Sequence, residues 1–482
     1  MNVARRLYST GGPLPPTIKS LFQISSSPSL RPNTISSIQG WIKSVRLLKK
    51  IAFIDLQDGT TNEPLKIVVK RTAEQDQLLK QLSTGQGIAI SDATWRDTPT
   101  REQKFELVVD QPNGISLLGN VQDSYPLQKK YHTLPFLRSL PTLKHRTSYL
   151  GSLLRFRSFV EDELANFFRK NHVSKVAPPI LTSGDCEGAG ELFRVESNSN
   201  VSEGKKNHYF GKPTFLTVST QLHLEVLALA LTRCWTLSPC FRAEESDTNR
   251  HLSEFWMLES ELCFVEDVHQ LTQFTEDMLK SVISACLQNQ NQLLQATTPE
   301  EGADSPEIVV SRWQTLLSNK WPNVTYTEAI DILKIQDQKL PFKFTPTWGE
   351  ALQTEHEKWL AGEYYNSPVF VTDYPRDCKA FYMKQSSDGK TVACFDLLVP
   401  QMGEIVGGSI REDNYGTLLQ EMKRRGMNFK ELEWYTDLRR NGSVPHGGFG
   451  LGLERLVSYL YGSRNIRDAI PFYRSATGVI DL

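Results

Sequence analysis

The chain has 482 residues, of which 23% are charged and 39% hydrophobic, and its formal net charge is −1. This length predicts two to four domains with room for a large core. No apolar run approaches the roughly 20 residues of a membrane-spanning helix, so no membrane partner is expected. Because the net charge is close to zero, a nucleic-acid partner would have to be met by local basic patches.

Cysteine usage indicates reduced thiols. The chain has seven cysteines, an odd number, and no two of them are separated by two residues. This pattern argues against a zinc site and against a disulfide framework.

The N-terminal segment contains basic residues without acidic ones. No Asp or Glu precedes Asp55, whereas eight basic residues do: Arg5, Arg6, Lys19, Arg31, Lys43, Arg46, Lys49 and Lys50. Residues 1–10 carry Arg and Ser, which is typical of a mitochondrial transit peptide, and stretches rich in Gly, Pro and Ser follow. We therefore predict a targeting segment over residues 1–33 and delivery to the mitochondrial matrix. A disordered basic tail is the alternative.

Residues 34–112 are predicted to form a small β domain. The expected strands cover residues 37–45, 51–56, 65–69, 87–94 and 105–109, and a short helix is expected over residues 73–82. Five strands with one helix after the third strand are the outline of an OB-fold. A fold of this kind does not by itself give a function.

Residues 113–146 are punctuated by proline and rich in basic residues, and we predict a hinge between domains. A contact with a phosphate backbone and a solvated linker explain its basic residues equally well. From Thr147 to about Asn171 the apolar residues recur at helical spacing, which predicts a long helix followed by a strand at Pro178. Residues 265–345 also show helical patterns, and we assign no chemistry to them.

The stretch from Trp235 to Phe264 predicts an antiparallel hairpin with a long polar tip. An apolar run ends in Arg242, turn-forming residues follow, and a second run from Glu254 alternates large apolar with acidic or polar residues. Arginine binds phosphate through two parallel hydrogen bonds, and an aromatic face such as Phe255 stacks a base. One hairpin could therefore hold both ends of ATP. A hairpin with a salt-bridged loop is the alternative.

Three buried strands are predicted over residues 368–375, 392–400 and 403–411. Buried strands rarely carry Asp or Glu without a partner, so Asp396 and Glu404 suggest bound Mg²⁺. Residues 446–456 then pass from a glycine-rich strand into an apolar helix that contains Arg455. A cation in that setting needs an anion, which the γ-phosphate of ATP would supply.

These segments together resemble a known family. The string Phe-Arg-Ala-Glu, Arg-His-Leu and Glu-Phe-Trp-Met within residues 241–257 resembles motif 2 of the class II aminoacyl-tRNA synthetases, in the form of their asparaginyl members (subclass IIb). The long helix and its strand resemble motif 1, the dimer interface, and residues 446–456 resemble motif 3. The resemblance covers residues 34–482. It implies an α+β protein with an N-terminal five-stranded OB-fold barrel and, over residues 147–482, a catalytic antiparallel β-sheet flanked by helices.

The resemblance implies ATP-dependent activation of asparagine, with Mg²⁺, and transfer of the asparaginyl group to the 3′ end of tRNA(Asn) by a homodimer. Arg242 would hold the α-phosphate and Arg455 the leaving pyrophosphate. The ATP-binding residues that it implies are Arg242, Glu244, Arg250, His251, Phe255, Glu404 and Arg455, and the metal ligands are Asp396 and Glu404.

For the amino acid, the resemblance implies Glu187 on the α-ammonium group, with Gln221, Glu225 and Arg411 as further contacts. Arg411 alone would favour aspartate, because its fork suits a carboxylate. An asparagine enzyme therefore needs a group that accepts from the amide NH₂ and repels a carboxylate, and Glu225 is our candidate. The alternatives are an idle acid in the first turn of a helix for Glu225, and a helix cap made by Ser219 or Thr220 for this stretch.

For tRNA, the resemblance places Phe53 on the middle anticodon base and Arg46 on the anticodon loop. Lys66 stands where relatives often carry Gln. OB-folds bind single strands with basic grooves and stacking rings. A core position in the barrel is the alternative for Phe53.

Three other functions deserve comparison. A synthetase-like binding module without catalysis usually lacks a motif arginine, but Arg242, Arg411 and Arg455 are present. An asparagine-synthetase-like paralogue lacks the OB domain, which this chain is predicted to contain. Aspartyl-tRNA synthetase is the alternative within the enzyme class.

Overall fold

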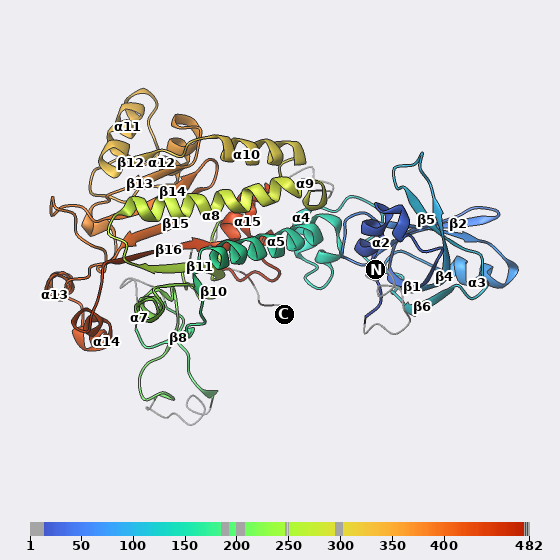
Figure 1. The fold of residues 1–482 in the computed structure, drawn as a ribbon, viewed down its shortest axis with the longest axis horizontal. Helices are drawn as coiled ribbons and strands as arrows, with labels where there is room; N and C mark the ends of the chain where they lie inside the picture. Colours follow the sequence, from blue (N-terminus) through green and yellow to red (C-terminus); the bar gives the residue numbers. More distant parts are fainter. Residues whose placement is uncertain are drawn as a thin grey trace. The chain divides into compact units, whose positions relative to one another are not determined.

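The computed structural model describes residues 14–184, 192–198, 208–245, 248, 250–294, 302–476, 478 and 480. The chain divides into two compact units (Figure 1). One unit comprises residues 1–152 with 291–301, and the other comprises residues 153–290 with 302–482.

The first unit contains a closed five-stranded barrel. Its elements are β1 (Thr34–Leu47), β2 (Ile51–Gln57), β3 (Leu65–Lys70), α3 (Ala73–Gln81), β4 (Gly87–Asp97) and β5 (Phe105–Val109). The strands follow the order β1-β2-β3-β5-β4, and pairing of β1 with β4 closes the barrel. Ala52, Ile54 and Leu56 of β2 are fully buried, which is the alternation expected for a barrel wall. The predicted OB-fold is confirmed.

The elements that were not predicted from the sequence include a strand and a helix of this barrel unit. Strand β6 (Ile115–Gly119) pairs with β4 inside the segment that we expected to be a hinge. Helix α2 (Ile18–Ser25) lies within the expected targeting segment, yet Ile18 and Leu21 are fully buried in the barrel core. The Ile18 amide donates to Asp58 at 2.7 Å. The barrel unit therefore includes residues 18–25, whereas residues 1–13 lie outside the described residues.

The second unit is built on an eight-stranded sheet. Its strands are β7 (Ser174–Lys175), β10 (Arg233–Phe241), β11 (Glu254–Cys263), β12 (Asn323–Thr325), β13 (Val369–Thr372), β14 (Cys394–Val399), β15 (Gly403–Ile410) and β16 (His446–Gly452). Their order is β12-β13-β14-β15-β16-β11-β10-β7. All neighbours are antiparallel except the two outermost pairs. The predicted hairpin is β10 and β11, and the three predicted buried strands are β13, β14 and β15.

Helices cover both faces of this sheet. The predicted long helix is α5 (Ser148–Lys170), and its Phe168 stacks on Trp235 of β10 at 4.6 Å. Helix α8 (Val268–Gln288) crosses the same face and contacts β14, β15 and β16 (Figure 1). Helix α7 (Gln221–Leu231) packs on Cys234, whose side chain points to the opposite face because neighbouring residues of a strand alternate.

Smaller elements complete the second unit. They are β8 (Leu181–Thr182), β9 (Phe215–Leu216), α10 (Pro306–Ser318), α11 (Tyr326–Lys339), α12 (Thr354–Trp359), α13 (Tyr415–Arg424), α14 (Glu433–Asp437) and α15 (Leu453–Tyr461). Helix α4 (Leu134–Arg138) and, apart from Gln290, helix α9 (Gln290–Leu293) belong to the residues of the first unit. Among the helices of the described residues, none is long and apolar enough to cross a membrane.

Candidate active site

A cavity of about 200 Å³ opens on the face of the sheet that α7 covers. Its lining includes predicted site residues from the start of α7, the β10–β11 hairpin, β14, β15 and the segment after β15: Gln221, Arg242, Asp396, Glu404 and Arg411. These residues come from segments as much as 190 positions apart in the chain, so the fold brings the predicted site together. Glu187 lies outside the described residues.

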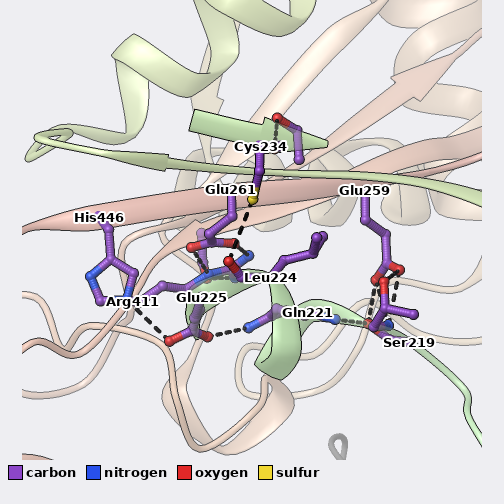
Figure 2. A network of polar contacts seen from close by, with 12 residues as sticks. Ser219, Gln221, Leu224, Glu225, Cys234, Glu259, Glu261, Arg411 and His446 are labelled. Atoms are coloured by element: carbon purple, nitrogen blue, oxygen red, sulfur yellow. Dashed lines mark hydrogen bonds and ion pairs between the residues drawn. The ribbon is translucent and has the colours of Figure 1, made fainter. Parts of the chain in front are cut away.

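Glu225 lies behind the cavity at the centre of a buried network (Figure 2). Its carboxylate accepts hydrogen bonds from His446 Nε2 at 3.0 Å and from Gln221 Nε2 at 3.2 Å. It also accepts hydrogen bonds from Tyr435 Oη at 2.9 Å and from Arg439 Nη2 at 2.8 Å. Burial opposes ionisation, but the charge of Arg439 and the hydrogen bond from His446 hold the pKa of Glu225 well below its usual value. Glu225 is therefore an ionised acceptor and not an idle helix acid.

His446 completes this network as a cation. Its Nδ1 lies 2.7 Å from the carbonyl oxygen of Val444, and its Nε2 lies 3.0 Å from Glu225. Both partners only accept, so both ring nitrogens must carry a proton. Burial lowers the pKa of His446, but the contact with Glu225 raises it above its usual value overall.

Arg411 is held in place by a second buried acid. Its Nε and Nη2 donate to Glu261 at 3.1 and 2.9 Å, and its Nη1 donates to Ser409 at 2.7 Å. Burial raises the pKa of Glu261 in spite of this arginine. Because Glu261 neutralises the guanidinium, Arg411 can offer a hydrogen-bond donor to the cavity without a large excess of positive charge.

Glu259, a buried acid two residues before Glu261 on β11, binds the start of α7. It accepts the backbone N–H of Thr220 at 2.9 Å and the side-chain hydroxyls of Ser219 and Thr220. The hydroxyls of Ser219 and Thr220 therefore donate to an acid of the sheet, and Thr220, the residue before α7, makes no side-chain cap of the kind considered as the alternative for this stretch. This contact fixes Gln221, the first residue of α7, over Glu225.

Glu225, Glu261 and His446 could in principle share a metal ion, because their ligand atoms lie within 4.8 Å of one another. Each carboxylate already forms an ion pair with an arginine, Arg439 for Glu225 and Arg411 for Glu261. Since His446 is protonated, it has no lone pair to offer a metal. We therefore do not assign a metal ion to this cluster, because Arg439 and Arg411 already neutralise its two carboxylates.

At the other end of the cavity, three arginines approach one histidine. Burial lowers the pKa of His251, and so do the charges of Arg455, Arg250 and Arg242. Arg242 lies over the ring of Phe255 at 5.5 Å, and Arg455 donates to the carbonyl oxygen of Glu404 at 3.1 Å. Glu244 lies 3.9 Å from Arg242. Such a concentration of positive charge is suited to a polyphosphate.

Three acids stand next to these arginines. A Cβ atom at Gly407 would lie 3.1 Å from Glu404 Oε1 and 3.4 Å from Asp396 Oδ1, so the two carboxylates converge there. Glu357 of α12 accepts the backbone N–H of Glu404 at 3.2 Å. Lys379 Nζ lies 2.8 and 2.6 Å from the two carboxylate oxygens of Asp396. Burial raises the pKa of Asp396, and Glu404 adds to the rise.

Comparison with known proteins identifies the family. The model of class II tRNA synthetases (D, K and N) matches residues 137–476, and that of the OB-fold nucleic acid binding domain matches residues 37–112. The chain belongs to the class II tRNA synthetases. It is 59% identical to the mitochondrial asparagine–tRNA ligase of Saccharomyces cerevisiae over 96% of each chain. It is 41% identical to that of Schizosaccharomyces pombe, over 97% and 98% of the two chains. The asparaginyl-tRNA synthetase of Pyrococcus horikoshii with asparaginyl-adenylate is 29% identical, over 94% and 97% of the two chains, with a TM-score of 0.80.

Several residues of this class II site were not singled out from the sequence. They are Glu261, Glu357, Lys379, Tyr435, Arg439 and His446. The Glu-Ser-Glu repeat on β11 was a usable signal, because a strand that places two acids on one buried face needs cationic partners. Nothing local marked Arg439, whose partner Glu225 lies 214 positions earlier.

The acid cluster predicts an unusual pH dependence of stability. Burial and the charge of Glu404 raise the pKa of Glu357 from 4.5 to about 7. A carboxyl whose pKa is raised by folding destabilises the folded state as pH rises from the unfolded value to the folded one. Without Mg²⁺, Glu357→Gln should therefore gain on the order of 2 kcal/mol over the wild type between pH 5 and pH 8. Thermal denaturation of both proteins between pH 5 and pH 8 measures this gain in stability. A stability difference that does not change with pH would contradict the raised pKa of Glu357.

Proposed function

We propose that the protein is an asparagine–tRNA ligase that forms asparaginyl-adenylate from asparagine and ATP and transfers the asparaginyl group to the 3′ end of tRNA(Asn). Its similarity to fungal mitochondrial asparagine–tRNA ligases supports the activity. The observation that carries the choice of amino acid is the ionised Glu225 behind Gln221, next to an Arg411 that Glu261 already neutralises.

Asparagine and aspartate differ in charge and in hydrogen-bond donors. Gln221 Nε2 donates to Glu225 Oε1 at 3.2 Å, and this nitrogen is the same chemical group as the amide nitrogen of asparagine. The substrate amide would replace Gln221 at that oxygen, while Arg411 donates to its carbonyl oxygen. The side-chain carboxylate of aspartate in the same place would lie next to the ionised Glu225 with no proton to form a hydrogen bond. Such a close contact between like charges costs several kcal/mol.

Arg242 and Phe255 divide the recognition of ATP between them. The guanidinium of Arg242 lines the cavity and would hold the α-phosphate, where negative charge grows when the asparagine carboxylate attacks. Phe255 would stack the adenine. Arg455, with Arg250 and His251 close by, would hold the pyrophosphate as it leaves. These groups act by position and charge, and no protein nucleophile is required.

Asp396 and Glu404 fit a Mg²⁺ ion. Their carboxylates converge at Gly407, Glu357 accepts the backbone N–H of Glu404, and Lys379 contacts Asp396. Burial raises the pKa of Asp396 and of Glu357, and the charge of Glu404 adds to both rises, so a divalent cation would stabilise the ionised carboxylates. When bound, Mg²⁺ supplies positive charge to the phosphates of ATP.

The barrel face that carries Phe53 supports anticodon binding. Phe53 lies on the outward side of β2, pairs in register with Arg46 of β1 and is not part of the core. Lys66 of β3 pairs with Asp55 at 2.6 Å on the same side. This arrangement offers a ring and two basic groups to a single strand.

Phe53→Ala should weaken binding of tRNA by about 1–3 kcal/mol of lost stacking. Aminoacylation would fall while activation of asparagine is retained, because the two sites lie in different units. Parallel charging and pyrophosphate-exchange assays test this, with Phe53→Tyr as the control that keeps the ring. An equal loss in both assays would mean that Phe53 is needed for folding.

We further infer a mitochondrial protein of the matrix. Support comes from the basic, acid-free N-terminus and from the mitochondrial relatives. Because Ile18 and Leu21 belong to the barrel core, the targeting information should lie in residues 1–16. A reporter carrying residues 1–16 should enter mitochondria, whereas deletion of residues 1–27 should destabilise the enzyme by several kcal/mol. A reporter left in the cytosol would contradict the targeting assignment.

The resemblance of α5 to motif 1 supports a homodimer, which sedimentation of the purified protein tests.

Charging of tRNA with labelled asparagine and with labelled aspartate tests the proposed activity. Asparaginyl-tRNA should be the product, and aspartyl-tRNA alone would establish the alternative enzyme.

A further inference from the structure

One buried arginine connects helix α5 to two distant segments of the chain. The side chain of Arg157 on α5 is 9% exposed, and its Nη1 donates to Glu454 Oε1 at 2.7 Å and to the carbonyl oxygen of Ala469 at 2.9 Å. Its Nε donates to Glu161, one turn further along α5, at 2.8 Å. In the described part of the chain, these partners include none of the residues assigned above to asparagine or ATP.

Glu454 extends this contact to the sheet. It is the second residue of α15, its side chain is 1% exposed, and its Oε2 accepts the backbone N–H of Trp256 on β11 at 3.0 Å. One carboxylate oxygen therefore binds α5 and the other binds the backbone of β11. Burial raises the pKa of Glu454, and the charge of Arg157 opposes that rise. An amide side chain has only one acceptor oxygen, so it could not hold both donors in this way.

The sequence neighbours of these residues are proposed ATP contacts. Trp256 follows Phe255, the proposed adenine-stacking ring, and Glu454 precedes Arg455, the proposed pyrophosphate contact. Neighbouring Cα atoms are only about 3.8 Å apart, so a shift of the backbone at Trp256 or at Glu454 also moves the next residue. The hydrogen bond from Trp256 to Glu454 therefore fixes the two ends of the proposed ATP site relative to each other.

The C-terminal segment provides a second connection to the adenine end. Ala469, whose carbonyl oxygen accepts from the guanidinium of α5, lies between the buried Ile466 and Ile470. These two isoleucines form a cluster with Leu252, and Phe255 packs against that cluster. The same guanidinium therefore fixes the segment that supports the Phe255 ring.

We propose that Arg157 and Glu454 are positioning residues that together hold Phe255 and Arg455 at the separation that ATP requires. This inference rests on the proposed function. Both residues act through their neighbours, so loss of the pair should weaken binding of ATP. Binding of asparagine should be nearly unchanged, because its proposed contacts lie at the start of α7 and after β15.

A buried ion pair that supports only the fold is the alternative, and Arg312 provides the matched control. Its side chain is 11% exposed, it pairs with Asp304, and its Nη1 donates to the carbonyl oxygen of Tyr459 on α15 at 2.7 Å. Arg312 therefore anchors the same helix as Arg157 does. Neither Asp304 nor Tyr459 is a sequence neighbour of a proposed ATP contact.

The Michaelis constants for ATP and asparagine in pyrophosphate exchange, together with equilibrium dialysis of ATP, test the proposal. Glu454→Gln should raise the KM and the Kd for ATP at least about tenfold, because small misplacements of binding groups are costly. The KM for asparagine should change by less than about twofold. Arg157→Lys keeps the charge but loses the fork, so its effect should be smaller and in the same direction. Arg312→Lys should lower the Tm and leave both Michaelis constants within about twofold of the wild type.

Equal rises in the two Michaelis constants, or an unchanged affinity for ATP in a folded Glu454→Gln, would overturn the proposal. An equal rise in the KM for ATP in Arg312→Lys would also overturn it, because any loosening of α15 would then be sufficient. If Glu454→Gln does not fold, the double variant Arg157→Leu/Glu454→Gln, which buries no charge, replaces it with the same expected results. Absence of asparagine-dependent exchange in the wild type would contradict the proposed function itself. Normal exchange in the wild type, combined with unselective changes in the variants, would contradict only the positioning pair.

Discussion

Arg242→Ala is expected to reduce asparagine-dependent pyrophosphate exchange by at least about 10²–10³-fold. Arg242 lines the substrate cavity and lies over Phe255, the proposed adenine-stacking ring, at 5.5 Å. Loss of its guanidinium would leave the charge that builds on the α-phosphate without its nearest donor. The side chain is 33% exposed, so its removal should leave stability close to that of the wild type.

Two comparisons make this result specific. Arg242→Lys keeps the charge but loses the two parallel hydrogen bonds, so its activity should lie between those of the wild type and Arg242→Ala. Thermal denaturation shows whether each variant is folded. Near-normal exchange by a folded Arg242→Ala would move the ATP site away from the β10–β11 hairpin.

Glu225→Gln is expected to have the second large effect, a strong loss of activity with asparagine and a smaller preference over aspartate. The glutamine side chain would no longer repel a substrate carboxylate, and it would offer a weaker acceptor to the substrate amide. Because Arg439 and His446 would both lose a buried anion, the folded state should also lose about 3–5 kcal/mol.

The ratio of kcat/KM for asparagine to that for aspartate separates these two effects. Both values come from one preparation, so the fraction of folded enzyme cancels from the ratio. Tyr435→Phe is the matched control, because it removes one donor to Glu225 at 2.9 Å and keeps the charge. An unchanged ratio in Glu225→Gln would mean that Glu225 only supports the structure.

The pH dependence of Glu225→Gln follows from the same contacts. Arg439 and His446 hold the pKa of Glu225 below its usual value of 4.5. A carboxyl with a lowered pKa stabilises the folded state above its unfolded pKa, and this stabilisation is lost as pH falls below that value. The wild type should therefore lose its advantage over Glu225→Gln when thermal denaturation is repeated below pH 4.5.

Patterns that depend on neighbours in the sequence were sufficient to predict much of this protein. Alternation of apolar and polar residues located the strands of the barrel and of the β10–β11 hairpin, and helical spacing located α5. Family motifs were sufficient to select Arg242, Arg411 and Arg455. In each case the signal lies within one strand, one helix or one turn.

Most of the site residues that the sequence analysis did not predict have partners in distant segments of the chain. Glu261 binds Arg411 from 150 positions away, so neither sequence neighbourhood reveals the pair. Arg439 follows α14 in a segment whose charged residues resemble those of a solvated surface, and only the fold brings it to Glu225. Helix α2 was hidden because its basic and Ser-rich surroundings resemble a leader, although Ile18, Leu21 and Ile24 have the spacing of a buried helix face.

Pyrophosphate exchange by the wild-type protein, with asparagine and aspartate measured side by side, tests the central claim most directly. Exchange with asparagine should exceed exchange with aspartate by at least about 10²-fold, because a close like-charge contact costs several kcal/mol. Equal exchange with the two amino acids, or a preference for aspartate, would contradict the assignment of Glu225 and Arg411 to an asparagine site.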